Sequence, residues 1–162
     1  MEGTKPFHSL ENASAPLCLE KVCFAWPSGK KVLNNCSFSI LKPGLWMLVG
    51  ANGSGKSTLF KIISGMLRAQ SGQITCNLKP ALMFQNPDHQ LLMPSCASDL
   101  LLSVPRALSH KERLARIQVA LKQVDLSSMD SRPIHTLSGG QKQRLALAGA
   151  LVSDANLLLL DE

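Results

Sequence analysis

The fold is decided by the stretch GANGSGKS, residues 50–57, which fits the pattern G-x-x-x-x-G-K-[ST]. It follows an apolar run at 45–49 and precedes residues 57–67, whose apolar side chains recur at helical spacing. Glycines in such a loop let backbone N–H groups turn inward at a helix start, where they bind anions. A glycine-rich turn with a chance Lys-Ser is the alternative, and it is less favoured with strand and helix both in place. The sequence therefore predicts a phosphate-binding loop whose binding residues are Gly50, Asn52, Gly53, Ser54, Gly55, Lys56, Ser57 and Thr58.

Four leucines at 157–160 form a second motif, because they end on two carboxylates, Asp161 and Glu162. In a nucleotide site of this kind, Lys56 supplies a positive charge to the β- and γ-phosphates and Ser57 supplies a hydroxyl to Mg²⁺. Asp161 would hold Mg²⁺ directly or through water, and Glu162 would polarise the attacking water as a general base. Two acids at a solvated strand end are common in proteins. The two carboxylates therefore indicate a nucleotide site only in combination with the phosphate-binding loop that precedes them in the chain.

A third motif, LSGGQ at residues 137–141, opens a helical stretch that runs to about residue 152. Ser138 is a good N-cap, and Gly139 and Gly140 expose backbone N–H groups at the helix start. The motif is either a second phosphate-binding helix terminus or simply a capped helix. LSGGQ is the signature of the ATP-binding-cassette (ABC) proteins, which the chain resembles. The resemblance implies that Ser138, Gly139, Gly140 and Gln141 close on the nucleotide held by an opposite subunit.

Two further residues take a role only through this resemblance. Gln85 ends an expected strand and precedes Asn86-Pro87, so it matches the family's Q-loop glutamine, which senses Mg²⁺ and the γ-phosphate. Trp26 matches the aromatic residue that stacks on adenine, a contact that contributes about 1–3 kcal/mol. The alternative for Trp26 is a turn residue packed on the sheet edge. The resemblance thus implies Glu162 and Gln85 as catalytic residues and Ser57, Gln85 and Asp161 as metal-binding residues.

Residues 84–91 and 141–151 carry a closer likeness to the energy-coupling-factor or cobalt-type importer ATPases. The likeness implies ATP and Mg²⁺ as cofactors and a second ATPase subunit, identical or different, as a partner. It also implies an integral membrane transporter subunit and the uptake of a metal ion or a vitamin. Pro94, Ser95 and Asp99 lie where the family's helical region docks on that subunit. Such a protein would be peripheral on the cytoplasmic face of a membrane, or on the interior face of an organelle such as a plastid.

Alternating strands and helices predict an α/β fold. Strands are expected at 17–24, 32–40, 45–49, 73–76, 81–84 and 157–160, and helices at 57–67, at 98–124 with a break at Pro105, and at 141–152. The resemblance makes this a P-loop NTPase core sheet with an antiparallel β edge subdomain and a helical subdomain at about 90–135. The domain is expected over 17–162, after an extension at 1–16 that is expected to be disordered. In the middle helix, Leu114, Ile117 and Leu121 are expected on one apolar face.

The formal net charge of +6 can indicate a nucleic acid or an anionic membrane surface as a partner. No RNA- or DNA-binding motif accompanies the charge, so a solvated basic surface is favoured and no nucleic-acid partner is expected. The five cysteines include no C-x-x-C pair, which favours reduced thiols in an intracellular compartment. No apolar run approaches the roughly 18–20 residues of a transmembrane helix.

The resemblance breaks off after Glu162, where the family continues with a D-loop and a strand that carries a switch histidine. His8, His89, His110 and His135 all precede that point, so we assign them to surface or packing roles. The domain is expected to be incomplete, and these 162 residues alone to be inactive as an ATPase. Two alternatives to a transport ATPase stay open. One is a non-catalytic protein that binds ATP or a partner, and the other is a soluble ABC ATPase acting on ribosomes or in Fe–S assembly.

Overall fold

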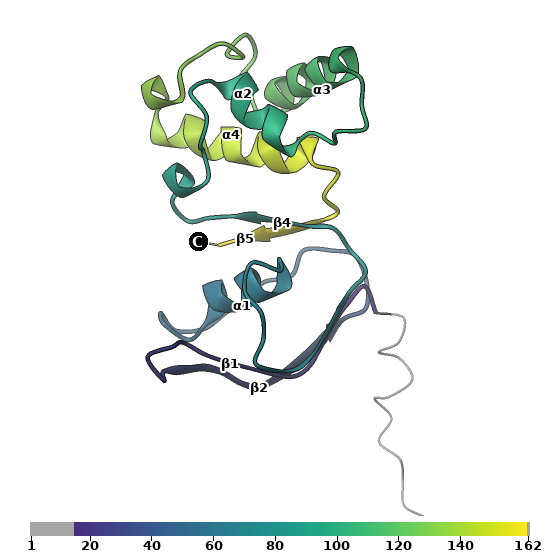
Figure 1. Cartoon of the computed structure of the whole chain (residues 1–162), viewed down its shortest axis with the longest axis vertical. Coiled ribbons are helices and arrows are strands. Elements are labelled where there is room, and N and C mark those ends of the chain that lie inside the picture. Colours follow the sequence, from purple (N-terminus) through teal and green to yellow (C-terminus); the bar gives the residue numbers. More distant parts are fainter. Residues whose placement is uncertain (1–14, 162) are drawn as a thin grey trace, which may run out of the picture. The chain divides into compact units, whose positions relative to one another are not determined.

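The computed structural model describes residues 15–161. The disorder expected for residues 1–16 therefore concerns a segment that, apart from Ala15 and Pro16, lies outside the described residues. The chain forms two compact units, Met1–Leu78 and Lys79–Glu162, and each is described by itself. Figure 1 shows the elements of both units. The domain predicted over 17–162 includes residues of both units and stays a prediction.

Antiparallel strands form the sheet of the first unit, in the order β2-β1-β3. The strands β1 (Leu17–Ala25), β2 (Lys31–Ile40) and β3 (Ser71–Cys76) confirm those expected at 17–24, 32–40 and 73–76. A tight turn joins β1 to β2, in which Trp26 donates its N–H to the Lys30 carbonyl at 3.0 Å. Gly29 has a φ of 82° in this turn, a left-handed conformation that glycine enters without steric cost. This sheet is the antiparallel β subdomain that the resemblance implies.

The buried side chains of β1 change phase in the middle of the strand. Leu17 and Leu19 are buried, as is Cys18 between them, and the next buried positions are Val22 and Phe24. Lys21 between them has a φ of 48°, and the register with β2 shifts between Leu19 and Val22. This is a β-bulge, whose extra residue resets the alternation. Both halves of the strand therefore keep their apolar side chains on the core.

Helix α1 (Lys56–Ile63) follows the glycine-rich loop and is shorter than the helix expected at 57–67. Its buried residues Leu59, Ile62 and Ile63 form the apolar face that the spacing predicts. Gly65 lies just beyond the helix with a φ of 78°. Glycine ends helices readily in this left-handed conformation because it carries no Cβ. The apolar side chains after Gly65 therefore do not extend the helix.

The strand expected at residues 45–49 is not formed, and that expectation is wrong. No strand pairs with this apolar segment, the 45–49 run, in the part of the chain that the structure describes. Leu45 and Met47 expose 95% and 83% of their surface. An apolar strand is buried on both faces when elements cover both of them and neighbouring strands pair with its edges. The described strands of this unit pair only with one another, which leaves the 45–49 run exposed.

A parallel strand pair and helices form the described part of the second unit. Its elements are β4 (Pro80–Met83), the 3₁₀ turn η2 (Pro87–His89), α2 (Cys96–Ser103), α3 (His110–Gln123), the 3₁₀ turn η3 (Ile134–Thr136), α4 (Gly139–Val152) and β5 (Leu157–Leu160). They confirm the strands expected at 81–84 and 157–160 and the expected helical stretches. Figure 1 shows α2, α3 and α4 packed together on one side of the β4–β5 pair. Within residues 15–161, no helix is long and apolar enough to cross a lipid bilayer.

The helices of the second unit share one apolar core and begin in the same way. The side chains of Ser95, Ser109 and Ser138 each accept a backbone N–H from the first turn of α2, α3 and α4. In each helix the side chain of the third residue accepts the backbone N–H of the serine, which completes a capping box. The fully buried core residues include Cys96, Leu100, Leu121, Leu126, Leu145, Ala148 and Val152.

One detail of burial, in α3, differs from the expectation, and a second concerns β5. Leu114 is exposed, whereas Ile117, Ala120 and Leu121 face the core from α3. The buried apolar face of α3 is therefore shorter than expected, because it begins at Ile117, about one turn after Leu114. In β5 only Leu159 is buried, so the four-leucine strand is covered on one face.

Candidate functional site

The glycine-rich loop at residues 50–57 contains two glycines in left-handed backbone conformations. Gly53 and Gly55 have φ values of 78° and 101°, conformations that residues with a side chain rarely adopt. A Cβ on Gly55 would lie 2.7 Å from the Cγ1 atom of Val32, so the loop rests against β2 with no room for a side chain. No neighbouring atom lies within 4 Å of the position that a Cβ on Gly53 would take. The loop is therefore packed on β2 at Gly55 and open at Gly53.

Lys56 folds back over this loop. Its Nζ atom donates to the carbonyl oxygens of Gly50 at 2.8 Å and Ala51 at 3.0 Å. The Ser54 N–H donates to the same Ala51 carbonyl at 3.1 Å, which closes the loop on itself. The ammonium group lies between oxygen acceptors at the N-terminal end of α1, a place that also favours an anion. The residues present fit a phosphate group, whose oxygens can replace the two carbonyls as acceptors for Lys56.

The remaining loop residues differ in their exposure. Asn52 and Ser57 are exposed. Exposure of the Ser57 hydroxyl is compatible with its predicted role as a ligand of Mg²⁺. Thr58 is buried in the core of the first unit. Its backbone N–H, in the first turn of α1, is the group that it offers to a phosphate. The predicted role of Thr58 therefore rests on its backbone.

Trp26 lies in the turn between β1 and β2 and is 37% exposed. Its ring meets the Phe24 ring edge to face, with centroids 5.1 Å apart and planes at 87°. Aromatic pairs prefer this geometry, which supports packing on the sheet. The exposed part of the indole leaves area for a stacked base as well. Adenine stacking by Trp26 stays a prediction.

The start of helix α4 presents the third motif. The Ser138 N–H donates to Gln141 Oε1 at 2.9 Å, and the Gln141 N–H donates to Ser138 Oγ at 3.3 Å. Gly139 and Gly140 are exposed, and no atom lies within 4 Å of where their Cβ atoms would be. Their N–H groups belong to the first turn, where the helix itself supplies no acceptor. The arrangement is a capped helix start with an open approach to backbone donors.

Gln85 and Asp161 leave neighbouring strands at the same edge. Met83 pairs with Leu160 in the parallel β4–β5 ladder, and the Asp161 N–H donates to the Met83 carbonyl at 3.0 Å. Gln85 is exposed two residues after the end of β4. The carboxyl ends of parallel strands in an α/β sheet commonly carry ligand-binding groups. Glu162, the predicted general base, lies outside the described residues.

The predicted site residues belong to both units. Trp26 and the loop residues lie in Met1–Leu78, whereas Gln85, the LSGGQ motif and Asp161 lie in Lys79–Glu162. Within the second unit, the structure brings Gln85 and Asp161 to one sheet edge. Within the first unit, it brings the Lys56 ammonium group onto the loop.

A groove in the second unit was not expected from the sequence. Its volume is about 420 Å³, and it is lined by Asp88, Leu91, Leu92, Met93, Pro94, Ile134, His135 and Lys142. Of the residues predicted to dock on a membrane subunit, only Pro94 lines it. Asp99 instead accepts the N–H groups of Leu92 and Met93 at 2.8 Å and 3.0 Å, and Ser95 caps α2. No sequence signal marks the groove, because at least 40 positions of the chain separate the residues of its two walls.

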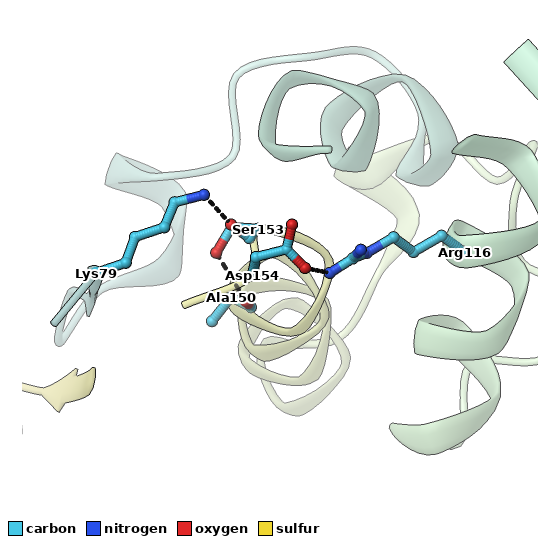
Figure 2. A network of polar contacts seen from close by, with 5 residues as sticks. All are labelled: Lys79, Arg116, Ala150, Ser153 and Asp154. Carbon is cyan, nitrogen blue, oxygen red and sulfur yellow. Dashed lines mark hydrogen bonds and ion pairs between the residues drawn. The ribbon is translucent and has the colours of Figure 1, made fainter. Parts of the chain in front are cut away.

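The far end of α4 is held by two cations, as Figure 2 shows. Lys79 donates its Nζ to the Ser153 carbonyl, and Arg116 of α3 pairs with the Asp154 carboxylate. The Ser153 hydroxyl turns back to the Ala150 carbonyl at 2.8 Å. Cations at a helix C-terminus satisfy its last carbonyls and its dipole. The helix that starts at the LSGGQ motif is thereby fixed at its C-terminal end to α3 and to the residue before β4.

Comparison with known proteins shows what the chain is similar to. The family described as "ABC transporter" matches residues 33–162. The Arabidopsis thaliana protein "ABC transporter I family member 10" is 44% identical over 133 residues, which cover 81% of this chain and 49% of that protein. "Energy-coupling factor transporter ATP-binding protein EcfA" of Methanocaldococcus jannaschii is 36% identical over 155 residues, which cover 86% of this chain and 56% of that protein.

Two solved structures have the same fold. The cbiO1 protein of Clostridium perfringens, described as part of the ABC transporter complex cbiONQ, superposes with a TM-score of 0.78 at 32% identity. The alignment covers 92% of this chain and 66% of that one. A putative metal-chelate type ABC transporter in an inward-facing conformation gives a TM-score of 0.74 at 25% identity, over 92% of this chain and 60% of that one. The chain spans about half the length of the curated relatives named above.

Proposed function

The chain belongs to the ABC transporter family, and we propose that it is the nucleotide-binding part of a membrane transporter, where it binds MgATP and hydrolyses it together with a second ATPase subunit. These 162 residues alone are expected to be inactive as an ATPase. The observation that carries the proposal is the position of Lys56. Its ammonium group is held against the loop of residues 50–57 by two carbonyl oxygens, at the N-terminal end of α1. A cation, glycine N–H groups and a helix N-terminus at one point make a site for a polyphosphate.

Each predicted site residue has a separate role in the proposed hydrolysis. Backbone N–H groups of the loop and the Lys56 ammonium would hold the β- and γ-phosphates. Ser57, Gln85 and Asp161 would hold Mg²⁺, which neutralises charge on the phosphate oxygens when it is bound. Glu162 would accept the proton of the attacking water, which Gln85 helps to orient. The common edge at which Gln85 and Asp161 leave β4 and β5 supports their joint role.

A second ATPase subunit, identical or different, is the proposed partner at the start of α4. Ser138 is engaged with Gln141, so the capping box keeps the first turn ordered. Gly139 and Gly140 leave the backbone donors of that turn accessible. An accessible helix N-terminus binds a phosphate of another molecule as readily as one of its own chain. The LSGGQ motif would thereby close on the nucleotide of the opposite subunit.

The groove is the proposed contact with an integral membrane transporter subunit. Leu91, Leu92, Met93, Pro94 and Ile134 give it an apolar lining, and Asp88, His135 and Lys142 add charged or polar groups. Apolar centres with polar edges are typical of protein interfaces. The solved relative described as part of the cbiONQ complex supports such an assembly. We propose an importer of a metal ion or vitamin, peripheral on a membrane face, with no nucleic-acid partner.

Nucleotide binding tests this function, with Lys56→Ala as the decisive variant. Because the loop loses its placed cation, the affinity for MgATP should fall by at least about a hundredfold. Lys61→Ala is the matched control, since it removes a lysine from the last turn of the same helix. The affinities are measured by calorimetry on folded protein, as judged by circular dichroism. Equal MgATP affinity in the wild type and in Lys56→Ala would refute the assignment of residues 50–57.

A further inference from the structure

An ion pair links two segments of the second unit that are far apart in the sequence. Lys142 Nζ lies 2.6 Å from Asp88 Oδ1, across 54 residues of chain. The Lys142 side chain is 19% exposed, whereas that of Asp88 is 59% exposed. Asp88 belongs to η2, three residues after Gln85, and Lys142 belongs to the first turn of α4. The pair therefore joins the segment that carries Gln85 to the helix that carries the LSGGQ motif.

The segment that contains Asp88, residues 84–93, is stabilised by hydrogen bonds within itself and to Asp99. The Phe84 N–H donates to Gln90 Oε1 at 3.3 Å, across the 3₁₀ turn that lies between them. Inside that turn, the Asp88 N–H donates to Asn86 Oδ1 at 2.9 Å. Asp99 holds the following residues through the N–H groups of Leu92 and Met93. Residues 84–93 therefore form a continuous braced segment, which supplies one wall of the groove and places Asp88.

The partner side of the pair is equally well defined. The Lys142 N–H donates to the Ser138 carbonyl at 2.9 Å, so the residue that holds Asp88 also closes the first turn of α4. The other end of α4 is fixed by Lys79 and Arg116 (Figure 2). A force on Lys142 therefore acts on the turn of Ser138, Gly139 and Gly140. The C-terminal end of the helix stays in place.

We propose that Asp88 and Lys142 are a positioning pair that transmits displacement of the groove wall at 84–93 to the first turn of α4. The inference rests on the proposed function, in which Gln85 and the LSGGQ motif both face nucleotide. Neither Asp88 nor Lys142 touches the reacting atoms in this role. An occupant of the groove would change the placement of the LSGGQ backbone donors by moving Asp88. The pair thereby connects partner contact to the second phosphate-binding terminus.

An exposed ion pair can also be incidental, since many contribute almost nothing to stability. A double-mutant cycle separates the two cases, because it measures coupling rather than stability. Asn86→Ala loosens η2 by removing the acceptor for the Asp88 N–H. Lys142→Gln removes the charge at the α4 end, and Asp88→Asn breaks the same pair from the other end. The readout is amide hydrogen exchange of residues 139–147, measured by mass spectrometry on the full chain.

The proposal predicts that loosening η2 changes the amide exchange of α4 only when the Asp88–Lys142 ion pair is intact. Asn86→Ala should speed exchange in the first turn of α4 by about threefold in the wild-type background. The same substitution should add nothing in the Lys142→Gln or Asp88→Asn background. Lys142→Arg, which keeps a cation in reach of Asp88, should restore the response to Asn86→Ala. Arg144→Gln is the matched control, because Arg144 lies on the same helix and forms no ion pair among residues 15–161.

Additive effects of Asn86→Ala and Lys142→Gln would overturn the proposal, as would an equal response in the Arg144→Gln and Lys142→Gln backgrounds. The exchange measurement is separate from the test of the proposed function, which is the MgATP affinity of Lys56→Ala. If Lys56→Ala binds MgATP normally, the function fails while the coupling can still be present. If Lys56→Ala loses MgATP and the cycle is additive, only the coupling fails.

Discussion

Gly55 lies so close to Val32 that an added Cβ would be 2.7 Å from the Val32 Cγ1 atom and 3.1 Å from its carbonyl oxygen. Real Cβ atoms do not approach other heavy atoms to 2.7 Å, so any side chain at this position must displace β2 or the loop. Gly55 also has a φ of 101°. Two independent restraints, one steric and one conformational, therefore act on the residue before Lys56.

Gly55→Ala should lower the free energy of unfolding by about 1–3 kcal/mol, because the left-handed backbone and the contact with Val32 both resist the Cβ. The measurement is urea unfolding followed by circular dichroism. Gly139→Ala is the control, since no atom lies within 4 Å of its added Cβ. Its free energy of unfolding should change by less than about 0.5 kcal/mol. Equal destabilisation by the two variants would show that the loop can shift to accommodate a Cβ at Gly55, which contradicts the two restraints described above.

Two candidate roles for Trp26, adenine stacking and packing on Phe24, can be separated by substitution. If the indole stacks on adenine, Trp26→Ala should weaken MgATP binding by about one to two orders of magnitude, and Trp26→Phe should have a mild effect. If the indole only packs on Phe24, Trp26→Ala should lower stability by about 0.5–1.5 kcal/mol and leave the affinity unchanged. Calorimetric titration with MgATP and thermal unfolding of the same samples decide between them. Equal affinity in all three proteins excludes stacking.

Acid should loosen the start of α3 through Glu112. Hydrogen bonds from the Ser109 hydroxyl at 2.6 Å and the Ser109 N–H at 2.8 Å hold the pKa of Glu112 below its ordinary value. The contribution of this carboxylate is therefore fully present above the unfolded-chain pKa of about 4.3, and it is lost as the pH falls through the lower folded pKa. Glu112→Gln should make exchange of the first-turn amides of α3 less dependent on pH in this range. An unchanged pH profile would show that the carboxylate does not control the cap.

Much of the fold could be predicted because its signals are local. Each helix of the second unit begins at a serine whose cap involves a side chain three residues later, and the sequence already points to Ser138 as an N-cap. The glycine-rich loop is also local, since its pattern and its left-handed glycines lie within eight residues. These features depend on a few neighbouring residues. Their signals can therefore be recognised without knowing which distant residues pack against them.

The features that could not be predicted depend on distant residues. The 45–49 run has the composition of a buried strand, but burial also needs partner strands, which composition does not supply. The groove and the Asp88–Lys142 pair join residues about 50 positions apart. The two stretches that contain Asp88 and Lys142 do not show by themselves that these side chains meet. The candidate site shows the same division. Each of its motifs could be recognised in the sequence separately. That Gln85 and Asp161 lie at the same edge could be seen only from the pairing of β4 with β5.

The 45–49 run should make the chain associate with itself. Leu45 and Met47 expose 95% and 83% of their surface, and Trp46, Leu48 and Val49 are also exposed. Contiguous exposed apolar side chains favour association, because burying them against another molecule removes them from water. The double variant Leu45→Lys with Met47→Lys should therefore shift the onset of association to about tenfold higher protein concentration. Light scattering over a concentration series gives that onset.

The control for this prediction adds the same two charges elsewhere. Ser28→Lys with Asn34→Lys places lysines at exposed polar positions of the β1–β2 hairpin. Both double variants raise the net charge equally, and charge alone opposes association. If the apolar run drives association, only the variant in the 45–49 run should shift the onset strongly. Equal shifts in the two variants would assign the effect to net charge, and the exposed run would then have no part in association.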